Sequence, residues 1–162
     1  MNPIQPADTL HLESAKGWCE LGSFSEANEE LEKISSPSSA HPDVMEVRWQ
    51  IYSNLKRRDC ILEIAVEIIK LDPRRVTGWL YKANSLQELN RPLEAYETLI
   101  EANERFPKNK TVLFELSDIC CMLPERLNES DDWLAKSLEI GIQKVKTKAF
   151  DDPRFDQFNR QD

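Results

Sequence analysis

The sequence predicts an all-α solenoid, a stack of antiparallel helix hairpins, on the strength of three observations. Four leucines recur 34 residues apart, at positions 21, 55, 89 and 123, and a fixed period of this length is typical of arrays in which each repeat is one supersecondary unit. The nine prolines fall between the periodic segments, which are rich in Ala, Leu, Glu and Lys and so favour helix. With 162 residues, of which 40% are hydrophobic, the chain can bury a core and is too apolar to be disordered. We expect helices and no sheet.

The first hairpin is expected at residues 8–21 and 25–34. One face of each helix is apolar, and we expect it to point inward; its residues are Ala15, Trp18, Leu21, Ala27, Leu31 and Ile34. Gly22 can end the first helix with a positive φ. The SSPSS run after Ile34 reads as a polar connection made of turn residues.

Three further hairpins follow at the same interval. The second is expected at 43–55 and 59–71, and it stops at Pro73. The third is expected at 76–89 and 92–106, with Asn90, the best substitute for glycine in a left-handed turn, where Gly22 stands in the first. The fourth begins near Lys110, runs to Leu123, turns at Pro124 and resumes near residue 127.

The segment from Trp79 to Pro107 resembles a tetratricopeptide repeat. The matching large and small residues are Trp79, Ala83, Leu86, Asn90, Ala95, Leu99, Ala102 and Pro107. Small residues let the two helices of a hairpin approach closely, and large ones fill the gaps beside them. In the second repeat, Trp49 and Ile61 stand where this family prefers small residues, and Ala65 on the facing helix can compensate. The fourth repeat needs a one-residue insertion at its turn.

The resemblance implies one domain over residues 1–162, a right-handed superhelix of four hairpins with a C-terminal cap. The repeats are about 8–41, 42–75, 76–109 and 110–141, and the cap is 142–162. Phe150, Phe155 and Phe158 offer apolar anchors for that cap, and the alternative is that this segment binds a partner. The AFDDPRFDQF run is similar to the ending of compact bacterial tetratricopeptide proteins.

Members of this family line the concave side of the superhelix with the first helix of each hairpin. The residues that the resemblance places there, as a partner-binding surface, are Leu12, Lys16, Gln50, Asn54, Leu80, Asn84, Gln87, Phe114, Asp118 and Met122. Apolar anchors alternate with amides, a pattern suited to an extended peptide or a helix. The basic turn of Lys56, Arg57 and Arg58 is the alternative docking edge. A clamp for a chaperone's C-terminal carboxylate is not expected, because only Lys16 and Asn84 offer isolated donors.

The expected function is therefore a non-enzymatic scaffold or adaptor that binds a protein partner. The chain is similar in size, repeat count and ending to bacterial kinesin light chains, which would make the partner a bacterial tubulin-type filament subunit. The alternatives are a secretion-type chaperone for a partner protein and an accessory module of a larger assembly. Secretion chaperones place an amphipathic segment before three repeats, whereas here the first repeat begins by Asp8.

Composition and motifs argue against several other classes. The formal charge of -8 argues against general affinity for nucleic acid or anionic membranes. No stretch approaches the roughly 20 apolar residues of a membrane span, and the start lacks the pattern of a signal peptide, so a cytoplasmic protein is expected. Neither histidine has a nucleophile at a suggestive spacing, and the four glycines compose no phosphate loop. We expect no enzyme activity and no cofactor. The oligomeric state stays open.

The four cysteines, Cys19, Cys60, Cys120 and Cys121, lie inside expected helices. Disulfide frameworks instead belong to small, loop-rich folds, so reduced thiols are expected. Adjacent cysteines have the wrong spacing for paired zinc ligands, and we expect no metal and thiols buried on helix faces.

Overall fold

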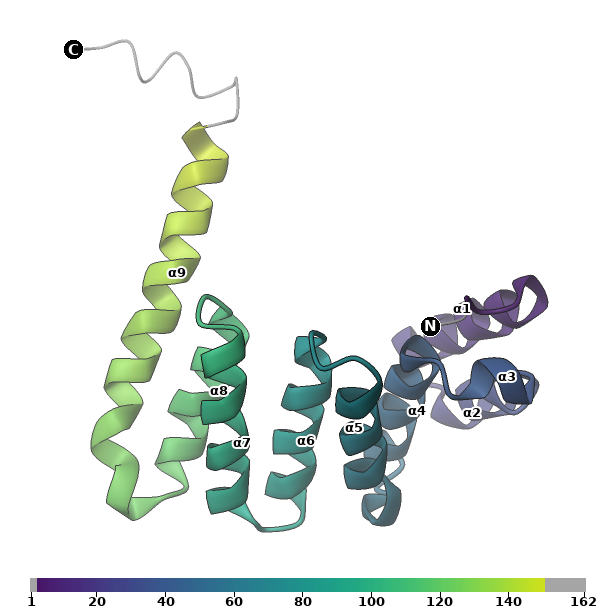
Figure 1. Cartoon of the computed structure of the whole chain (residues 1–162), viewed down its shortest axis with the longest axis horizontal. Coiled ribbons are helices and arrows are strands. Elements are labelled where there is room, and N and C mark those ends of the chain that lie inside the picture. Colours follow the sequence, from purple (N-terminus) through teal and green to yellow (C-terminus); the bar gives the residue numbers. More distant parts are fainter. Residues whose placement is uncertain (1–2, 151–162) are drawn as a thin grey trace. The chain divides into compact units, whose positions relative to one another are not determined.

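The computed structural model describes residues 3–150, with side chains for residues 3–142. Every regular element in this range is a helix, as expected (Figure 1). The chain forms two compact units, which meet between Thr98 and Leu99 in the sequence. Of the expected cap, residues 151–162 lie outside the described part of the chain, and residues 143–150 are described only as helical backbone.

The first unit begins with a helix hairpin and a short serine helix. α1 spans Pro6–Glu20, α2 spans Phe24–Leu31 and α3 spans Ser36–Ser39. The SSPSS segment was expected to be a polar connection made of turn residues, and within this connection the chain forms the short helix α3. Asp8 anchors the segment, because its carboxylate accepts hydrogen bonds from the Ser35 backbone N–H at 2.9 Å and from Ser35 Oγ at 2.6 Å. These bonds tie the start of α3 to the first turn of α1.

The same unit continues with α4 (Pro42–Asn54), α5 (Arg58–Leu71), α6 (Val76–Glu88) and the first half of α7 (Pro92–Arg105). Packing follows chain order: α4 contacts both α1 and α2, and α6 contacts both α4 and α5. Each new hairpin therefore begins with a helix that lies against both helices of the hairpin before it.

The turns inside the hairpins repeat their backbone conformation every 34 residues. Gly22 has φ of 74°, Lys56 has 59° and Asn90 has 57°. The left-handed turns expected at Gly22 and Asn90 are confirmed, and Lys56 adds one at the same place in the second hairpin. Pro124 occupies that place in the fourth hairpin, where its ring fixes φ near −65°. The chain there forms a 3-10 helix, η1 (Pro124–Glu129), in place of a tight turn.

The first unit holds two apolar clusters. One joins α1, α2 and α4, and its fully buried members include Ala15, Ala27, Leu31, Val44 and Ile51. The inward positions expected in the first hairpin are confirmed for Ala15, Ala27, Leu31 and Ile34.

Trp18 and Leu21 were also expected to point inward, and this is wrong: they are 39% and 74% exposed. Among the equivalent residues one or more periods later, Leu86, Cys120 and Leu123 are buried, whereas Leu55 is 42% exposed. For Trp18 the difference arises because α1 is the first helix, so no hairpin precedes it in the described chain to cover this face. Leu21 shares its exposure with Leu55, so its position is open in the second hairpin too.

The second cluster contains the two large residues that stand where small ones were expected. Trp49 and Ile61 are buried together with Ala65, which leaves room for them as expected. The Trp49 ring stacks on Tyr81 with centroids 3.9 Å apart, and its Nε1 donates to Ser85 Oγ at 3.0 Å. This pair of contacts fixes α6 against α4.

The second unit is a hairpin of α8 (Lys110–Cys121) and α9 (Ser130–Phe150) with η1 between them, preceded by the second half of α7 (Figure 1). Asn109 caps α8, since its side-chain oxygen accepts from the N–H groups of Thr111 and Val112. Ser130 Oγ donates to the Ser117 carbonyl at 3.0 Å, and Ser137 Oγ donates to the Lys110 carbonyl at 2.9 Å. Small residues thus let α9 approach α8 at both points.

Candidate protein-interaction site

Several of the residues that the sequence predicts for partner binding line a groove between α1 and α4. It has a volume of about 690 Å³ and lies entirely within the first unit. We call it the α1–α4 groove; it is lined by Lys16, Cys19, Glu20, Phe24, Asp43, Glu46, Val47, Gln50 and Asn54. Lys16, Gln50 and Asn54 are among the predicted site residues, and the structure brings these three together.

The polar groups of this groove are held by neighbours yet keep free capacity. Gln50 Nε2 donates to the Tyr81 hydroxyl at 3.0 Å, and Asn54 Nδ2 donates to the backbone carbonyl of Gln50 at 2.8 Å. The amide oxygens of Gln50 and Asn54 take no part in these two bonds, so each can accept a hydrogen bond from a ligand. Burial raises the pKa of Tyr81, so its hydroxyl stays protonated at neutral pH.

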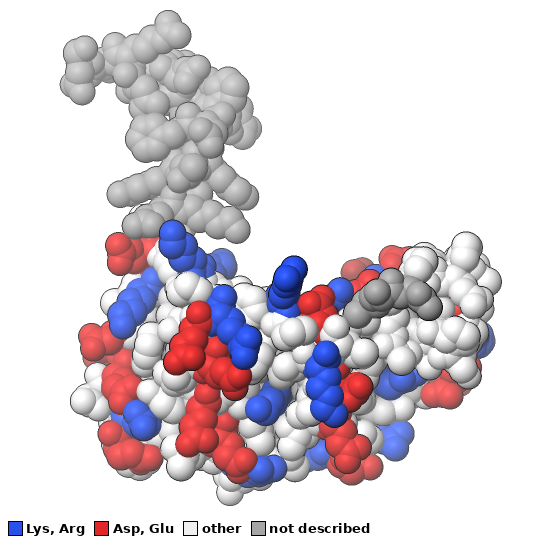
Figure 2. Space-filling view, in the orientation of Figure 1, with Lys and Arg blue, Asp and Glu red and all other residues white. Residues whose placement is uncertain are grey.

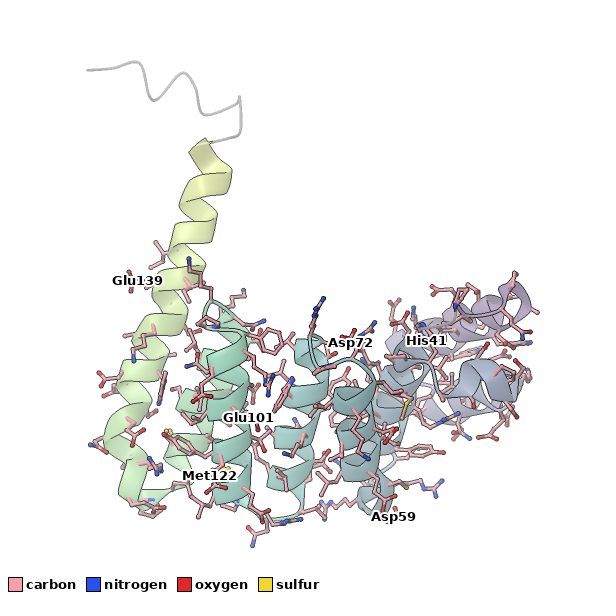
Figure 3. All side chains as sticks on the ribbon, in the orientation of Figure 1. His41, Asp59, Asp72, Glu101, Met122 and Glu139 are labelled. Atoms are coloured by element: carbon pink, nitrogen blue, oxygen red, sulfur yellow. The ribbon has the colours of Figure 1, made fainter. Side chains whose placement is uncertain are left out.

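Two acids of the groove lining, Asp43 and Glu46, belong to an ion cluster near the start of α6. Arg75 Nη1 bonds to Asp43 and lies 3.2 Å from Glu46 Oε1, and Arg75 Nε lies 3.4 Å from Asp72 Oδ2. Burial lowers the pKa of Arg75, but hydrogen bonds to Asp43 and Glu46 outweigh it and leave the pKa raised. The Thr77 hydroxyl also donates to Glu46. These acids are committed to the junction between α4, α5 and α6. Figure 3 shows Asp72 at the end of α5 where the chain turns toward α6, and Asp59 at its opposite end.

Leu12 was predicted to face the partner, and the structure corrects this. It is 2% exposed and packs in the cluster with Ile34, Val44 and Val47. The next hairpin's first helix, α4, covers it. Burial against a following helix removes this position from the surface, so Leu12 can stabilise the fold but cannot contact a ligand.

The three predicted residues of α6 do not join the α1–α4 groove. Asn84 is exposed, while Leu80 and Gln87 are partly buried. The Nε2 atom of Gln87 is buried and has no hydrogen-bond partner. Their place in a binding surface remains a prediction.

The predicted residues Phe114 and Asp118 of α8 and Met122 at its C-cap are all exposed, and Phe114 lines a pocket. Phe114 is 53% exposed and Met122 is 48% exposed. Phe114 belongs to a second hollow of about 490 Å³, which we call the α8–α9 groove; it is lined by Lys110, Thr111, Phe114, Ser137, Leu138, Gly141 and Ile142. Met122 lies at the far end of α8, away from Glu139 of α9 (Figure 3), and Asp118 does not line this groove.

Sequence reasoning missed lining residues of both grooves. Glu20 and Phe24 stand at the end of the first hairpin helix and the start of the second, so a search confined to first helices passes over Phe24. Leu138 and Ile142 are 57% and 55% exposed, whereas Leu138 was expected in the last repeat under a cap and Ile142 at the start of that cap. The sequence property that could have revealed these two residues is their apolar character on one face of α9.

The basic turn keeps internal partners for two of its three cations. Arg57 lies over the Tyr52 ring, 4.7 Å from its centroid, and Arg58 Nε lies 3.6 Å from Glu88 Oε2. On the face shown in Figure 2, basic and acidic side chains are interleaved. The role of this turn as a docking edge therefore remains a prediction.

The remaining chemistry is sparse in the described part of the chain. His11 Nδ1 lies 2.8 Å from Glu30 Oε2, and His41 caps α4 by accepting from the Asp43 N–H at 3.2 Å. Among the described side chains, no three His, Cys, Asp or Glu residues cluster as metal ligands would. The cysteines are free, and the expectation of buried thiols holds for Cys120 but not for Cys121, which is exposed. No helix in the described range is both long and apolar enough to cross a bilayer.

Comparisons with known proteins place the fold. No family model matches the chain, and no curated protein does. Solved structures do match. A structure of MamA has a TM-score of 0.74 at 14% identity, with 86% of this chain and 81% of that chain covered. MamA MSR-1 has a TM-score of 0.68 at 16% identity, with coverages of 85% and 78%.

A third structure is TTC0263, a thermophilic TPR protein of Thermus thermophilus. Its TM-score is 0.73 at 15% identity, with 82% of this chain and 74% of that chain covered. Identities this low carry information about the fold alone. Together with the helix hairpins and the 34-residue spacing of their turns, they show that the chain has the all-α fold of a tetratricopeptide-repeat protein.

Proposed function

We propose that this protein is a non-enzymatic adaptor that binds a protein partner in the α1–α4 groove. The observation that carries the proposal is the convergence of Lys16, Gln50 and Asn54 from two helices around one hollow of about 690 Å³. The resemblance to tetratricopeptide repeats selects these residues before any geometry is considered. The fold shared with tetratricopeptide proteins supports a role in protein–protein interaction.

The lining suits an extended peptide or a helix with mixed character. Phe24 and Val47 provide apolar contact, while the amide oxygens of Gln50 and Asn54 can accept from backbone or side-chain N–H groups. Lys16 is held only by an exposed pair with Glu13 at 2.7 Å. Such pairs contribute little, about 0–1 kcal/mol, so Lys16 can exchange Glu13 for an acidic group of a ligand.

The finer proposal for the partner is a filament subunit of the bacterial tubulin type. It rests on the resemblance of size, repeat count and ending to bacterial kinesin light chains. A cytoplasmic location goes with this proposal. Capture of the partner from the source cell with a tagged chain, identified by mass spectrometry, separates a filament protein from the secreted client of a secretion-type chaperone.

The test of the groove uses matched double variants and calorimetry against the purified partner. Lys16→Ala with Asn54→Ala removes two lining groups. The control is Lys33→Ala with Asn128→Ala, because Lys33 is an exposed lysine that also pairs with a glutamate three residues before it, Glu30, at 2.7 Å, and Asn128 is an exposed amide of the other unit. We expect the groove variant to weaken binding at least about tenfold, or ~1.4 kcal/mol, if either group is a binding hot spot.

Normal binding by the groove variant would refute the proposed site. Changing Lys56, Arg57 and Arg58 together to Ser tests the alternative edge. If that variant alone loses binding, the protein docks by its basic turn; if it only slows association and increases salt dependence, the turn steers the encounter.

A further inference from the structure

The α8–α9 groove is an apolar hollow on the last described hairpin. Phe114, Leu138 and Ile142 are each more than half exposed around it, and Lys110 is the one charged residue among its described lining. Three large apolar side chains gathered around a hollow of about 490 Å³ are unusual for a free surface. The position of the groove within its repeat indicates that it can hold a helix.

The lining residues have counterparts in the second hairpin, two periods earlier. Lys110, Thr111 and Phe114 correspond to Pro42, Asp43 and Glu46, 68 positions before them. With the one-residue insertion at Pro124, the α9 residues Ser137, Leu138, Gly141 and Ile142 correspond to Ile68, Ile69, Asp72 and Pro73, 69 positions before them. Burial supports this register, because Ser130 and Ser137 of α9 are buried like Ala95 and Ala102, 35 positions earlier.

In the second hairpin these counterparts form the seat of the next helix, α6. A Cβ on Gly78 of α6 would lie 2.9 Å from Ile68 and 3.0 Å from Ile69. Trp79 Nε1 donates to the Pro73 carbonyl at 3.2 Å. The α8–α9 groove is thus the same seat in the last hairpin.

The seat is open because α9 does not turn where α5 does. α5 ends at Leu71, just before Asp72 and Pro73, whereas α9 runs on to Phe150 through the equivalent Gly141 and Ile142. Within residues 3–142, whose side chains are described, no helix lies on the groove.

The first helix of the array exposes the matching helix face. Leu10 of α1 is 69% exposed. Its counterparts at the same position of later first helices, Val44, Gly78 and Val112, are all buried. Val44 packs with Leu12 and Ile34 of the preceding hairpin. Leu10 therefore stands on the face of α1 that would enter such a seat, together with the exposed Trp18, whose counterparts Leu86 and Cys120 are buried.

The α1 face and the α8–α9 groove also match in charge. At the α6 seat, Arg75 meets three carboxylates, those of Asp43, Glu46 and Asp72. In the α8–α9 groove the counterparts of these acids are Thr111, Phe114 and Gly141, and in α1 the counterpart of Arg75 is Ala7. Joining the two surfaces would therefore bury no unpaired charge at these positions, and an unpaired buried charge is strongly destabilising.

We propose that the α8–α9 groove is occupied by α1 of a second copy of this chain, so that copies associate head to tail. Such an interface is heterologous, with different surfaces on the two partners, and it leaves one free end on each side for further addition. It uses the Leu10 face of α1 and leaves Lys16, Gln50 and Asn54 outside the contact, so the proposed adaptor function can fail without affecting it.

Sedimentation velocity of the full chain over a wide range of concentration tests the proposal. We expect a distribution that grows with concentration. Leu10→Asp disrupts the α1 face and Leu138→Asp disrupts the α8–α9 groove. Each variant alone should be monomeric. Mixed together, they should form a dimer and nothing larger, because one variant keeps its groove and the other keeps its α1 face.

Leu127→Asp is the matched control, since Leu127 is 58% exposed on η1 and lies outside the groove; it should associate like the unchanged chain. Circular dichroism verifies that every variant is folded, and Leu10→Ser replaces Leu10→Asp should the latter unfold. A full chain that stays monomeric throughout overturns the proposal. So does a mixture of the two end variants that forms no dimer. If a chain ending at Phe150 associates while the full chain does not, the groove belongs to the chain's own last segment.

Discussion

Replacement of Gly78 by alanine provides the sharpest test of the packing between α5 and α6. A Cβ at this position would lie 2.9 Å from Ile68 Cγ2, 3.0 Å from Ile69 Cγ1 and 3.3 Å from the backbone nitrogen of Ile69. The first distance is shorter than a normal carbon contact. Ile68 is fully buried and, as a β-branched residue in a helix, has one strongly preferred rotamer, so it cannot swing away cheaply.

Two effects of opposite sign decide the outcome. Alanine in place of glycine inside a helix stabilises by about 0.8–1 kcal/mol. Overpacking of a filled core costs about 1–3 kcal/mol. Since a backbone atom lies within 3.3 Å and neither isoleucine can leave its place freely, the second effect should win. We expect Gly78→Ala to lower the free energy of unfolding by up to ~2 kcal/mol.

Gly17→Ala is the matched control, because Gly17 is also inside a helix and a Cβ there would meet nothing within 4 Å. This variant should gain only the higher helix propensity of alanine, and it should stabilise the protein by about 1 kcal/mol. Urea unfolding followed by circular dichroism ranks the three proteins. The reasoning is refuted if Gly78→Ala is as stable as Gly17→Ala, because the close approach of α6 to α5 would then have no energetic weight.

Three further predictions follow from burial. Ala83→Leu should cost about 1–3 kcal/mol of stability, while Asn84→Ala should change it by less than about 0.5 kcal/mol, because Ala83 is 2% exposed and its neighbour is exposed; urea midpoints in the reverse order would contradict this. Burial, with a nearby carboxylate, raises the pKa of Glu115, so its folded state holds a proton more tightly than the unfolded chain does. Stability should therefore fall as pH rises from the ordinary glutamate pKa, about 4.3, through the raised one, and Glu115→Gln should lack this decline in urea titrations at several pH values. A thiol reagent should modify Cys121 in the native protein and Cys120 only on unfolding, since Cys120 is fully buried; equal rates in mass spectrometry would argue against the assigned faces of α8.

The sequence period is sufficient to predict the helices and the hairpin turns. Gly22 and Asn90 carry the required conformational freedom in their own chemistry, so their positive φ can be predicted from sequence. Lys56 cannot be recognised in this way, because a lysine adopts φ of 59° only where its surroundings impose it. Likewise the short helix at Ser36–Ser39 depends on hydrogen bonds from Ser35 to Asp8, 27 residues away, which no local pattern reveals.

The exposure of the predicted site residues depends on which helices lie beside each repeat. Family register places Leu12 and Phe114 at equivalent positions, yet one is 2% and the other 53% exposed. α4 covers the first, and no described helix follows α8 and α9 to cover the second. Exposure at the ends of an array is set by what stands next to them, which a residue-by-residue pattern does not contain. Lys16, Gln50 and Asn54 line one groove because α1 packs against α4, the first helix of the following hairpin.

The first unit has two contacts between successive hairpins, and the ion cluster around Arg75 lies in only one of them. The two contacts therefore respond to different conditions. The contact of α4 with the first hairpin is apolar, and apolar stabilisation weakens on cooling. The contact of α6 with the second hairpin also contains Arg75 and three carboxylates, with 28% of the Arg75 side chain exposed, so added salt weakens part of its attraction. Stability in a stacked array is roughly a sum over adjacent units. Cold should therefore loosen this unit first beside α1, and high ionic strength should loosen it first beside α6, so hydrogen exchange under the two conditions would reveal different points of opening among the same few helices.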